Sequence, residues 1–176
     1  MSTRRAAGGI LGACLLLQGV GAADLPRPPE FTHTRPGEWL NSAPLTLAQL
    51  KGKVVLVEFW AFACSNCRES KAWVESVAER HAGDGLVVVA VHTPELAQEK
   101  SPDNVRDAVK RLAIRYPVMI DSDWSYWNAL HNRYWPAFYV IGRDGLVHGS
   151  AVGEMHTGQY GARELDGLID QLLAQR

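Results

Sequence analysis

Two cysteines separated by two residues, Cys64 and Cys67, are the side chains whose type and spacing best suit chemistry. They closely follow residues 54–60, an apolar run rich in β-branched and aromatic side chains, which is typical of a buried parallel strand. Residues 68–81 then carry apolar side chains at helical spacing and lack Pro and Gly, which predicts a helix. Cys64 therefore lies at a predicted helix N-terminus, where unpaired N–H groups and the helix dipole favour a thiolate.

The spacing of the pair favours a redox role over a structural one. Cys67 lies one helical turn beyond Cys64, so its sulfur can reach Cys64 and resolve a mixed disulfide formed there. A structural disulfide that closes so short a loop removes little entropy from the unfolded chain. A zinc site would need two more ligands, and the remaining cysteine, Cys14, lies in a segment that we predict to be removed. We interpret Cys64 as the attacking nucleophile and Cys67 as the resolving thiol, and we expect no metal or other cofactor.

Several separated motifs resemble one known superfamily. Residues 57–68, Val-Glu-Phe-Trp-Ala-Phe-Ala-Cys-Ser-Asn-Cys-Arg, resemble the active-site strand and turn of thioredoxins, and residues 52–57 are similar to the TlpA-like branch. Residues 85–95 and 132–137 resemble the redox domain of DipZ-type proteins. The motifs agree in order from about Trp39 to the C-terminus, which makes the resemblance specific. It implies an α/β, thioredoxin-like fold in which a central mixed sheet is flanked by helices.

The same resemblance assigns further site residues. In thioredoxin-like families a cis-proline faces the cysteine pair, and the resemblance places Pro136 there. A cis bond is costly except before proline, so the Trp135–Pro136 bond can adopt it. The alternative is that Pro136 has no role in the site, because a proline at the first residue of a strand is tolerated without loss of a ladder hydrogen bond. We expect Trp135, Ser65 and Asn66 to line the substrate groove.

Glu58 interrupts the apolar strand and matches the acidic residue that thioredoxins carry beneath the cysteines. Burial of a carboxyl group in an apolar strand raises its pKa. Glu58 is therefore a candidate proton acceptor for Cys67; the alternative is a carboxylate that points to water at the end of the strand. His92 and His131 could line the groove or be ordinary surface or core residues, and the sequence does not decide between these.

Charge and the N-terminal sequence indicate export. The chain has 176 residues with 18 basic and 19 acidic side chains and no basic patch, so we expect no nucleic-acid partner. Residues 1–22 contain Arg4 and Arg5, then an uncharged apolar stretch, then small residues, which predicts a secretory signal peptide. We expect a periplasmic or otherwise extracytoplasmic protein; anchoring by a lipid on Cys14 or by an uncleaved signal is the alternative.

Residues 23–37 are predicted to be a proline-rich linker without packing, and residues 38–176 are predicted to be a single, monomeric domain.

Hydrophobic patterning predicts the remaining elements. Short strands at 39–40 and 45–47 would form an N-terminal hairpin. An amphipathic helix capped by Ser101 is the extra helical insert, and residues 165–173 carry the apolar stripe of the closing helix. The other expected elements are strands at 86–92, 117–120, 137–141 and 146–150, and a helical turn at 124–130.

The sequence predicts an exported thiol-disulfide oxidoreductase that reduces disulfides in other exported proteins. The resemblance implies re-reduction by a membrane electron donor. The apolar Phe62 and Ala63 before Cys64 disfavour a thiolate, which predicts a potential closer to thioredoxin's (about −270 mV) than to a strong oxidant's (about −120 mV). Three alternative functions stay open. A disulfide oxidase or isomerase would differ from a reductase only in its reduction potential. A thiol peroxidase of this fold expects a Thr where Ala61 stands, and a copper-binding module of this fold spaces its cysteines by one more residue and adds a histidine.

Overall fold

The computed structural model describes residues 14–16 and 25–175, and for residues 14–16 it describes the backbone alone. The predicted signal peptide lies outside these ranges apart from residues 14–16, so its cleavage stays a prediction. Among the described residues, no helix has both the length and the apolar character that a membrane crossing needs.

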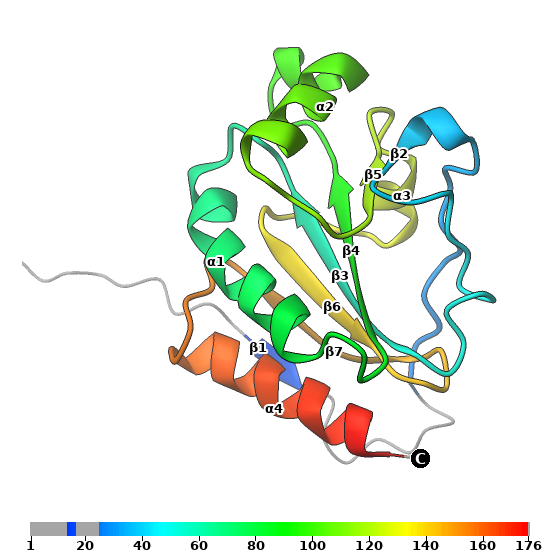
Figure 1. Cartoon of the computed structure of the whole chain (residues 1–176), viewed down its shortest axis with the longest axis vertical. Coiled ribbons are helices and arrows are strands. Elements are labelled where there is room, and N and C mark those ends of the chain that lie inside the picture. Colours follow the sequence, from blue (N-terminus) through cyan, green and yellow to red (C-terminus); the bar gives the residue numbers. More distant parts are fainter. Residues whose placement is uncertain (1–13, 17–24, 176) are drawn as a thin grey trace, which may run out of the picture.

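A seven-stranded mixed sheet forms the centre of the fold, in the order β1-β7-β6-β3-β4-β5-β2 (Figure 1). The middle strand β3 pairs in parallel with β4 and antiparallel with β6, so it is buried along its whole length. Because β3 leads to the cysteine pair, a strand that is buried along its whole length supports the site. The strands are β1 (Cys14–Leu16), β2 (Trp39–Leu40), β3 (Val54–Trp60), β4 (Leu86–His92), β5 (Val118–Ile120), β6 (Ala137–Ile141) and β7 (Val147–Val152).

Helices α1 (Ser65–Arg80) and α4 (Tyr160–Ala174) cover one face of the sheet (Figure 1). Helix α2 (Pro102–Arg111) packs at the cysteine end of the sheet, after the 3-10 turn η3 (Ala97–Lys100). Ser101 caps α2 as predicted, since its side chain accepts a hydrogen bond from the Asn104 N–H.

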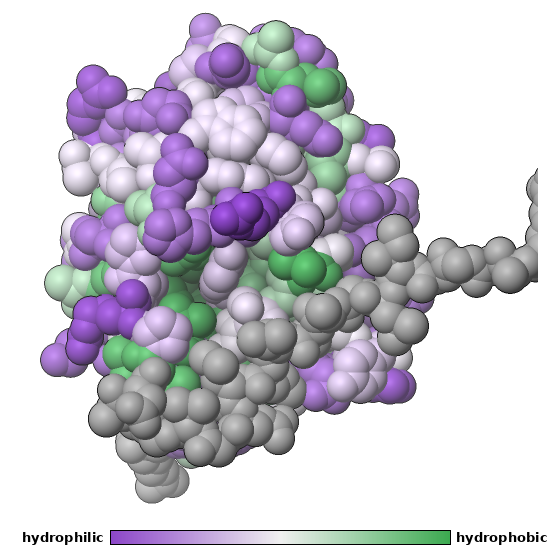
Figure 2. Space-filling model, turned by 180° about the vertical axis from the view of Figure 1, so that it is seen from behind, coloured by the Kyte–Doolittle hydropathy of each residue, from purple (hydrophilic) through white to green (hydrophobic). Residues whose placement is uncertain are grey.

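The opposite face of the sheet is covered by α3 (Ser125–Ala129) and by residues 25–50, which include the 3-10 turn η2 (Pro36–Glu38). Figure 2 shows the molecule from behind, where hydrophilic and neutral side chains dominate and the hydrophobic ones form small, separate areas. The apolar side chains on both faces of β3 are therefore shielded from solvent.

Most predicted elements are confirmed, but the N-terminal hairpin is wrong. Residues 45–47 form no strand, and β2 pairs instead with the distant β5, antiparallel to it. Trp39 accounts for the difference, because its indole is buried, packs edge-on against Phe31 and donates a hydrogen bond to the His33 carbonyl. Burial of a large aromatic side chain here outweighs a local hairpin of two very short strands.

The expectation that the proline-rich segment lies unpacked is also wrong. Phe31 is 2% exposed and packs against Tyr126, and the Pro26 carbonyl accepts a hydrogen bond from the N–H of Val147. His33 is buried between carboxylates, and its hydrogen bond to Asp121 raises its pKa although burial opposes this. The segment packs because the second face of the central strands needs an apolar cover, which the prolines alone did not indicate.

Candidate active site

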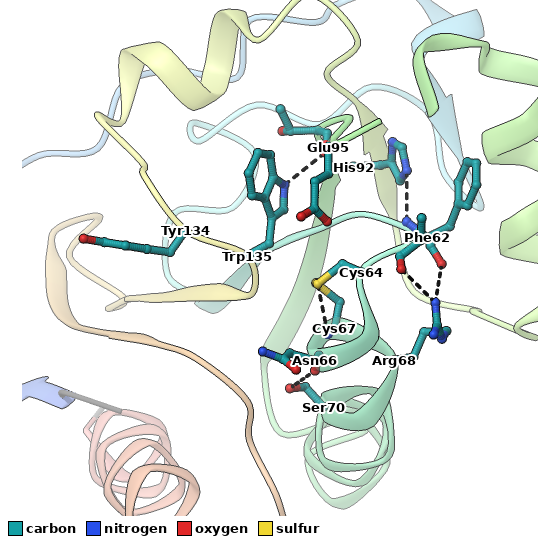
Figure 3. The surroundings of a disulfide bond; sticks show 12 residues. Phe62, Cys64, Asn66, Cys67, Arg68, Ser70, His92, Glu95, Tyr134 and Trp135 are labelled. Carbon is teal, nitrogen blue, oxygen red and sulfur yellow. Dashed lines mark hydrogen bonds between the residues drawn. A yellow bond between two sulfur atoms is a disulfide. The ribbon is translucent and has the colours of Figure 1, made fainter. Parts of the chain in front are cut away.

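The turn between β3 and α1 places the cysteine pair at the start of the helix. Cys64 is the N-cap of α1, and its sulfur accepts a hydrogen bond from the Cys67 N–H at 3.2 Å. The two residues form a disulfide, with their Cα atoms 5.3 Å apart (Figure 3). Cys64 is 8% exposed and Cys67 only 3%, so Cys64 is the more exposed residue of the pair. This exposure fits the predicted roles of nucleophile and resolving thiol.

The predicted cis-proline is present, because the Trp135–Pro136 peptide bond is cis. The indole N–H of Trp135 donates a hydrogen bond to the Thr93 carbonyl at 3.0 Å, and its ring packs against the cluster that contains both cysteines. In Figure 3, Trp135 and Glu95 lie on one side of the disulfide, and Phe62 and Arg68 on the other.

The two residues between the cysteines, Ser65 and Asn66, are exposed on the first turn of α1. The structure therefore gathers every sequence-predicted groove residue around the disulfide, but their contact with a substrate stays a prediction.

Glu58 lies in the middle of β3 and is 3% exposed, so the alternative of a carboxylate pointing to water is wrong. Burial raises the pKa of Glu58 from 4.5 to about 8; Glu75 also raises it and Lys71 lowers it. Glu58 and Cys67 line the same small hollow, whose volume of about 10 Å³ is roughly that needed for one water. The structure therefore brings Glu58 and Cys67 to the same hollow, and the catalytic role of Glu58 stays a prediction.

A buried carboxylate that the sequence did not indicate holds the loop before Cys64. Glu99 is 0% exposed and accepts hydrogen bonds from the N–H groups of Ala63 at 2.7 Å, Glu95 at 2.9 Å and Leu96 at 2.8 Å. It thereby joins the residue next to the nucleophile to the loop after β4. In the sequence Glu99 belongs to a polar stretch that resembles a surface loop, and only its position three residues after Leu96 suggests a capping role.

His92 is a buried core residue behind the site. It is 0% exposed, its ring stacks on Phe62, and its Nε2 accepts a hydrogen bond from the Phe62 N–H at 3.4 Å. Burial lowers the pKa of His92 to about 4, so the ring is neutral at physiological pH. His131 is exposed beside α3 and lines a separate hollow.

In the described part of the chain, a single group of histidine and acidic side chains converges closely enough to resemble a metal site: His33, Asp121 and Asp123. The Asp121 carboxylate, however, already accepts hydrogen bonds from Thr93 Oγ1 and from the Tyr126 N–H, in addition to its contact with His33. We therefore interpret the group as a hydrogen-bonding network that ties the N-terminal segment to α3.

Comparison with protein families and with curated proteins identifies related chains. The family model described as Redoxin matches residues 28–169. Protein DipZ of Mycobacterium tuberculosis is 41% identical over 138 residues, which are 77% of this chain and 19% of that protein. The chain thus spans about a fifth of the length of that relative. The thiol-disulfide oxidoreductase YkuV of Bacillus subtilis is 30% identical over 148 residues, which are 84% of this chain and 94% of YkuV.

A solved structure supports the fold independently. The putative thiol:disulfide interchange protein DsbE from Chlorobium tepidum superposes with a TM-score of 0.72 at 22% identity, covering 85% of this chain and 97% of that one. At this identity the similarity concerns the fold, and the chemistry of the site depends on the residues described above.

Proposed function

This chain belongs to the Redoxin family and is a thioredoxin-like thiol-disulfide oxidoreductase, and from that premise we propose that it works as a reductant of protein disulfides outside the cytoplasm. The observation that carries the proposal is the largely apolar surroundings of Cys64 at the start of α1, where no cation donates a hydrogen bond to its sulfur among the described residues. The disulfide-bonded state corresponds to the enzyme after it has passed its electrons on.

The first step is attack on the substrate. In the reduced enzyme, the Cys64 thiolate attacks one sulfur of the substrate disulfide, forms a mixed disulfide and displaces the other sulfur as a thiolate, which takes a proton from solvent. The Cys67 N–H and the N-terminal end of α1 stabilise the Cys64 thiolate before the attack. The cis peptide bond before Pro136 directly follows Trp135, which packs against the cluster that holds the cysteines, and we infer that an extended substrate segment lies there.

The second step releases the substrate. Glu58, as a carboxylate, accepts the proton of the Cys67 thiol through the hollow that both residues line. The Cys67 thiolate then attacks the Cys64 sulfur, the mixed disulfide breaks, and the substrate leaves with its second thiol reduced. Two electrons have moved from the dithiol to the substrate, and the enzyme holds the Cys64–Cys67 disulfide until an electron donor reduces it.

The charges around Cys64 favour the reductant direction. A strongly oxidising enzyme stabilises its thiolate with nearby positive charge. Here the charged guanidinium of Arg68 donates its hydrogen bonds to the carbonyls of Phe62 and Ala63 and not to the Cys64 sulfur. Because His92 is neutral, it offers no positive charge. The thiolate therefore gains little beyond the helix N-terminus, which favours the disulfide over the dithiol and makes the dithiol a good electron donor.

We predict a reduction potential for the Cys64–Cys67 pair closer to about −270 mV than to about −120 mV. For this two-electron couple about 30 mV corresponds to about 1.4 kcal/mol, so these two reduction potentials differ by several kcal/mol and a measurement can distinguish them. Equilibration of the protein with glutathione and dithiothreitol redox buffers, followed by thiol trapping, measures the value. A potential at the oxidising end, together with rapid oxidation of a reduced, unfolded protein, would instead assign the oxidase or isomerase function.

We also propose that the chain is exported and receives its electrons from a membrane protein. The charge pattern and the small residues of segment 1–22 support export. Mature protein isolated from its native compartment should begin near Ala23 and carry no lipid, which intact-mass analysis measures. A species that begins at Cys14 with added acyl mass would show a membrane-tethered enzyme instead.

A further inference from the structure

A second hollow shares Trp135 with the surroundings of the cysteine pair and has no role in the steps above. It has a volume of about 690 Å³ and lies between α3 and the segment that leads into β6. Its lining residues are Trp124, Trp127, Asn128, His131, Asn132, Arg133, Tyr134 and Trp135. Trp135 also packs against the cluster that holds the cysteines, so one side chain belongs to both the hollow and the active site. Figure 3 shows Trp135 beside the disulfide and Tyr134 pointing away from it.

Three tryptophans form a fixed aromatic wall in this hollow. The ring centroids of Trp127 and Trp135 are 4.2 Å apart, and Trp124 meets both rings edge-on at 5.2 and 5.3 Å. The hydrogen bond from the Trp135 indole to Thr93 fixes that ring further. Tyr134 adds an aromatic side chain that is 59% exposed. Such a wall favours apolar or aromatic side chains, which stack on it or meet it edge-on.

The loop that carries the hollow is held in shape before any ligand binds. Asn132 is 5% exposed; its side chain donates a hydrogen bond to the Tyr134 carbonyl and accepts one from the Tyr139 hydroxyl. Its backbone N–H donates to the Trp127 carbonyl at 2.9 Å. A ligand therefore does not have to order this loop, which lowers the cost of binding.

The lining of the hollow includes basic side chains but no acidic ones. Arg133 and His131 are exposed at the rim, and no lining residue is acidic. Among the described residues, none forms a hydrogen bond or ion pair with the Arg133 guanidinium. Glu95 lies beside the disulfide, and the Asp123 carboxylate accepts a hydrogen bond from the Ser125 N–H and faces His33. An occupant with a negative charge is therefore complementary to the Arg133 rim.

We propose that this hollow, which we call the tryptophan pocket, binds a segment of the substrate polypeptide next to its disulfide. An aromatic side chain of that segment packs on the tryptophan wall, and an acidic side chain pairs with Arg133. This inference rests on the proposed function and refines it, because it makes the enzyme prefer disulfides flanked by aromatic and acidic residues.

A binding experiment without redox chemistry tests the pocket. Short peptides with serine in place of cysteine, carrying Phe-Asp, Phe-Lys or Ala-Asp beside the serine, are titrated into ¹⁵N-labelled oxidised protein and the indole N–H signals are followed by NMR. We expect the Phe-Asp peptide to bind about 3-fold more tightly than Phe-Lys, the scale of an exposed ion pair, and about 3- to 10-fold more tightly than Ala-Asp. Arg133→Glu should reverse the preference between Asp and Lys.

Arg163→Glu is the matched control, since it makes the same charge change at an exposed position on α4 away from the pocket, and it should keep the wild-type order of affinities. Equal affinities for the three peptides, or equal effects of Arg133→Glu and Arg163→Glu, would overturn the proposal. So would indole shifts that depend on protein concentration alone, because a second copy of the chain would then occupy the pocket. Reduction of bis(2-hydroxyethyl) disulfide, which is neutral and aliphatic, is measured separately, so a failure of the reductase function is distinguished from a failure of the pocket.

Discussion

Cys67→Ser should accumulate covalent complexes with disulfide-bonded partner proteins, and Cys64→Ser should accumulate none. Without the Cys67 thiol, the mixed disulfide on Cys64 has no resolving group within the protein and persists. Without Cys64, the partner Cys67 is 3% exposed and lies inside α1, where a substrate disulfide cannot align with it. Both variants should lose turnover of a protein disulfide completely.

The complexes are measured as bands on non-reducing gels that disappear with dithiothreitol, and mass spectrometry identifies the partners. Introducing Cys14→Ser in the same chain excludes the third cysteine as the point of attachment. The double variant Cys64→Ser with Cys67→Ser shows the background. Complexes formed by the Cys64→Ser protein and not by the Cys67→Ser protein would reverse the two roles.

The cysteine pair and its supporting elements could be predicted because their signals are local. The β3 run, the Cys-x-x-Cys spacing and the α1 periodicity are contiguous, and each follows from a short stretch of sequence. The burial of Glu58 followed from its place in the middle of an apolar strand. The Trp135–Pro136 bond was predicted by combining the resemblance with the chemistry of proline.

What could not be predicted depends on contacts between distant segments. Glu99 lies in a polar stretch, and its function is visible only once the Ala63 N–H is next to it. Phe31 lies among prolines, whose composition suggests an unpacked linker, yet it closes the second face of the sheet. The tryptophan pocket joins α3 to the residues before β6, so its members are too far apart in the sequence to indicate a shared surface.

Glu58→Gln should slow release of the reduced substrate by about 10- to 100-fold at pH 8 to 9, while formation of the mixed disulfide changes little. A positioned general base typically contributes about 10²- to 10⁴-fold, and a thiol needs less help because it is partly ionised near neutral pH. In the wild type the release rate should rise through an apparent pKa near 8, where Glu58 becomes a carboxylate. Rapid quenching of a preformed mixed disulfide at a series of pH values measures this step. Glu69→Gln, at an exposed position on α1, should leave the profile unchanged.

The same substitution should change how stability depends on pH. In the unfolded chain the Glu58 carboxyl ionises near 4.5, and in the folded protein near 8, so between these values the folded state holds a proton that the unfolded state has lost. The free energy of unfolding of the wild type should therefore fall as pH rises from about 4.5 to about 8, by about 1.4 kcal/mol per pH unit from this group. Glu58→Gln removes this loss. Urea unfolding at pH 5 and pH 9 should show that the variant gains several kcal/mol relative to the wild type at the higher pH. If the difference between variant and wild type were the same at both pH values, Glu58 would not be a buried carboxyl with a raised pKa, and its assignment as the proton acceptor of the second step would lose its support.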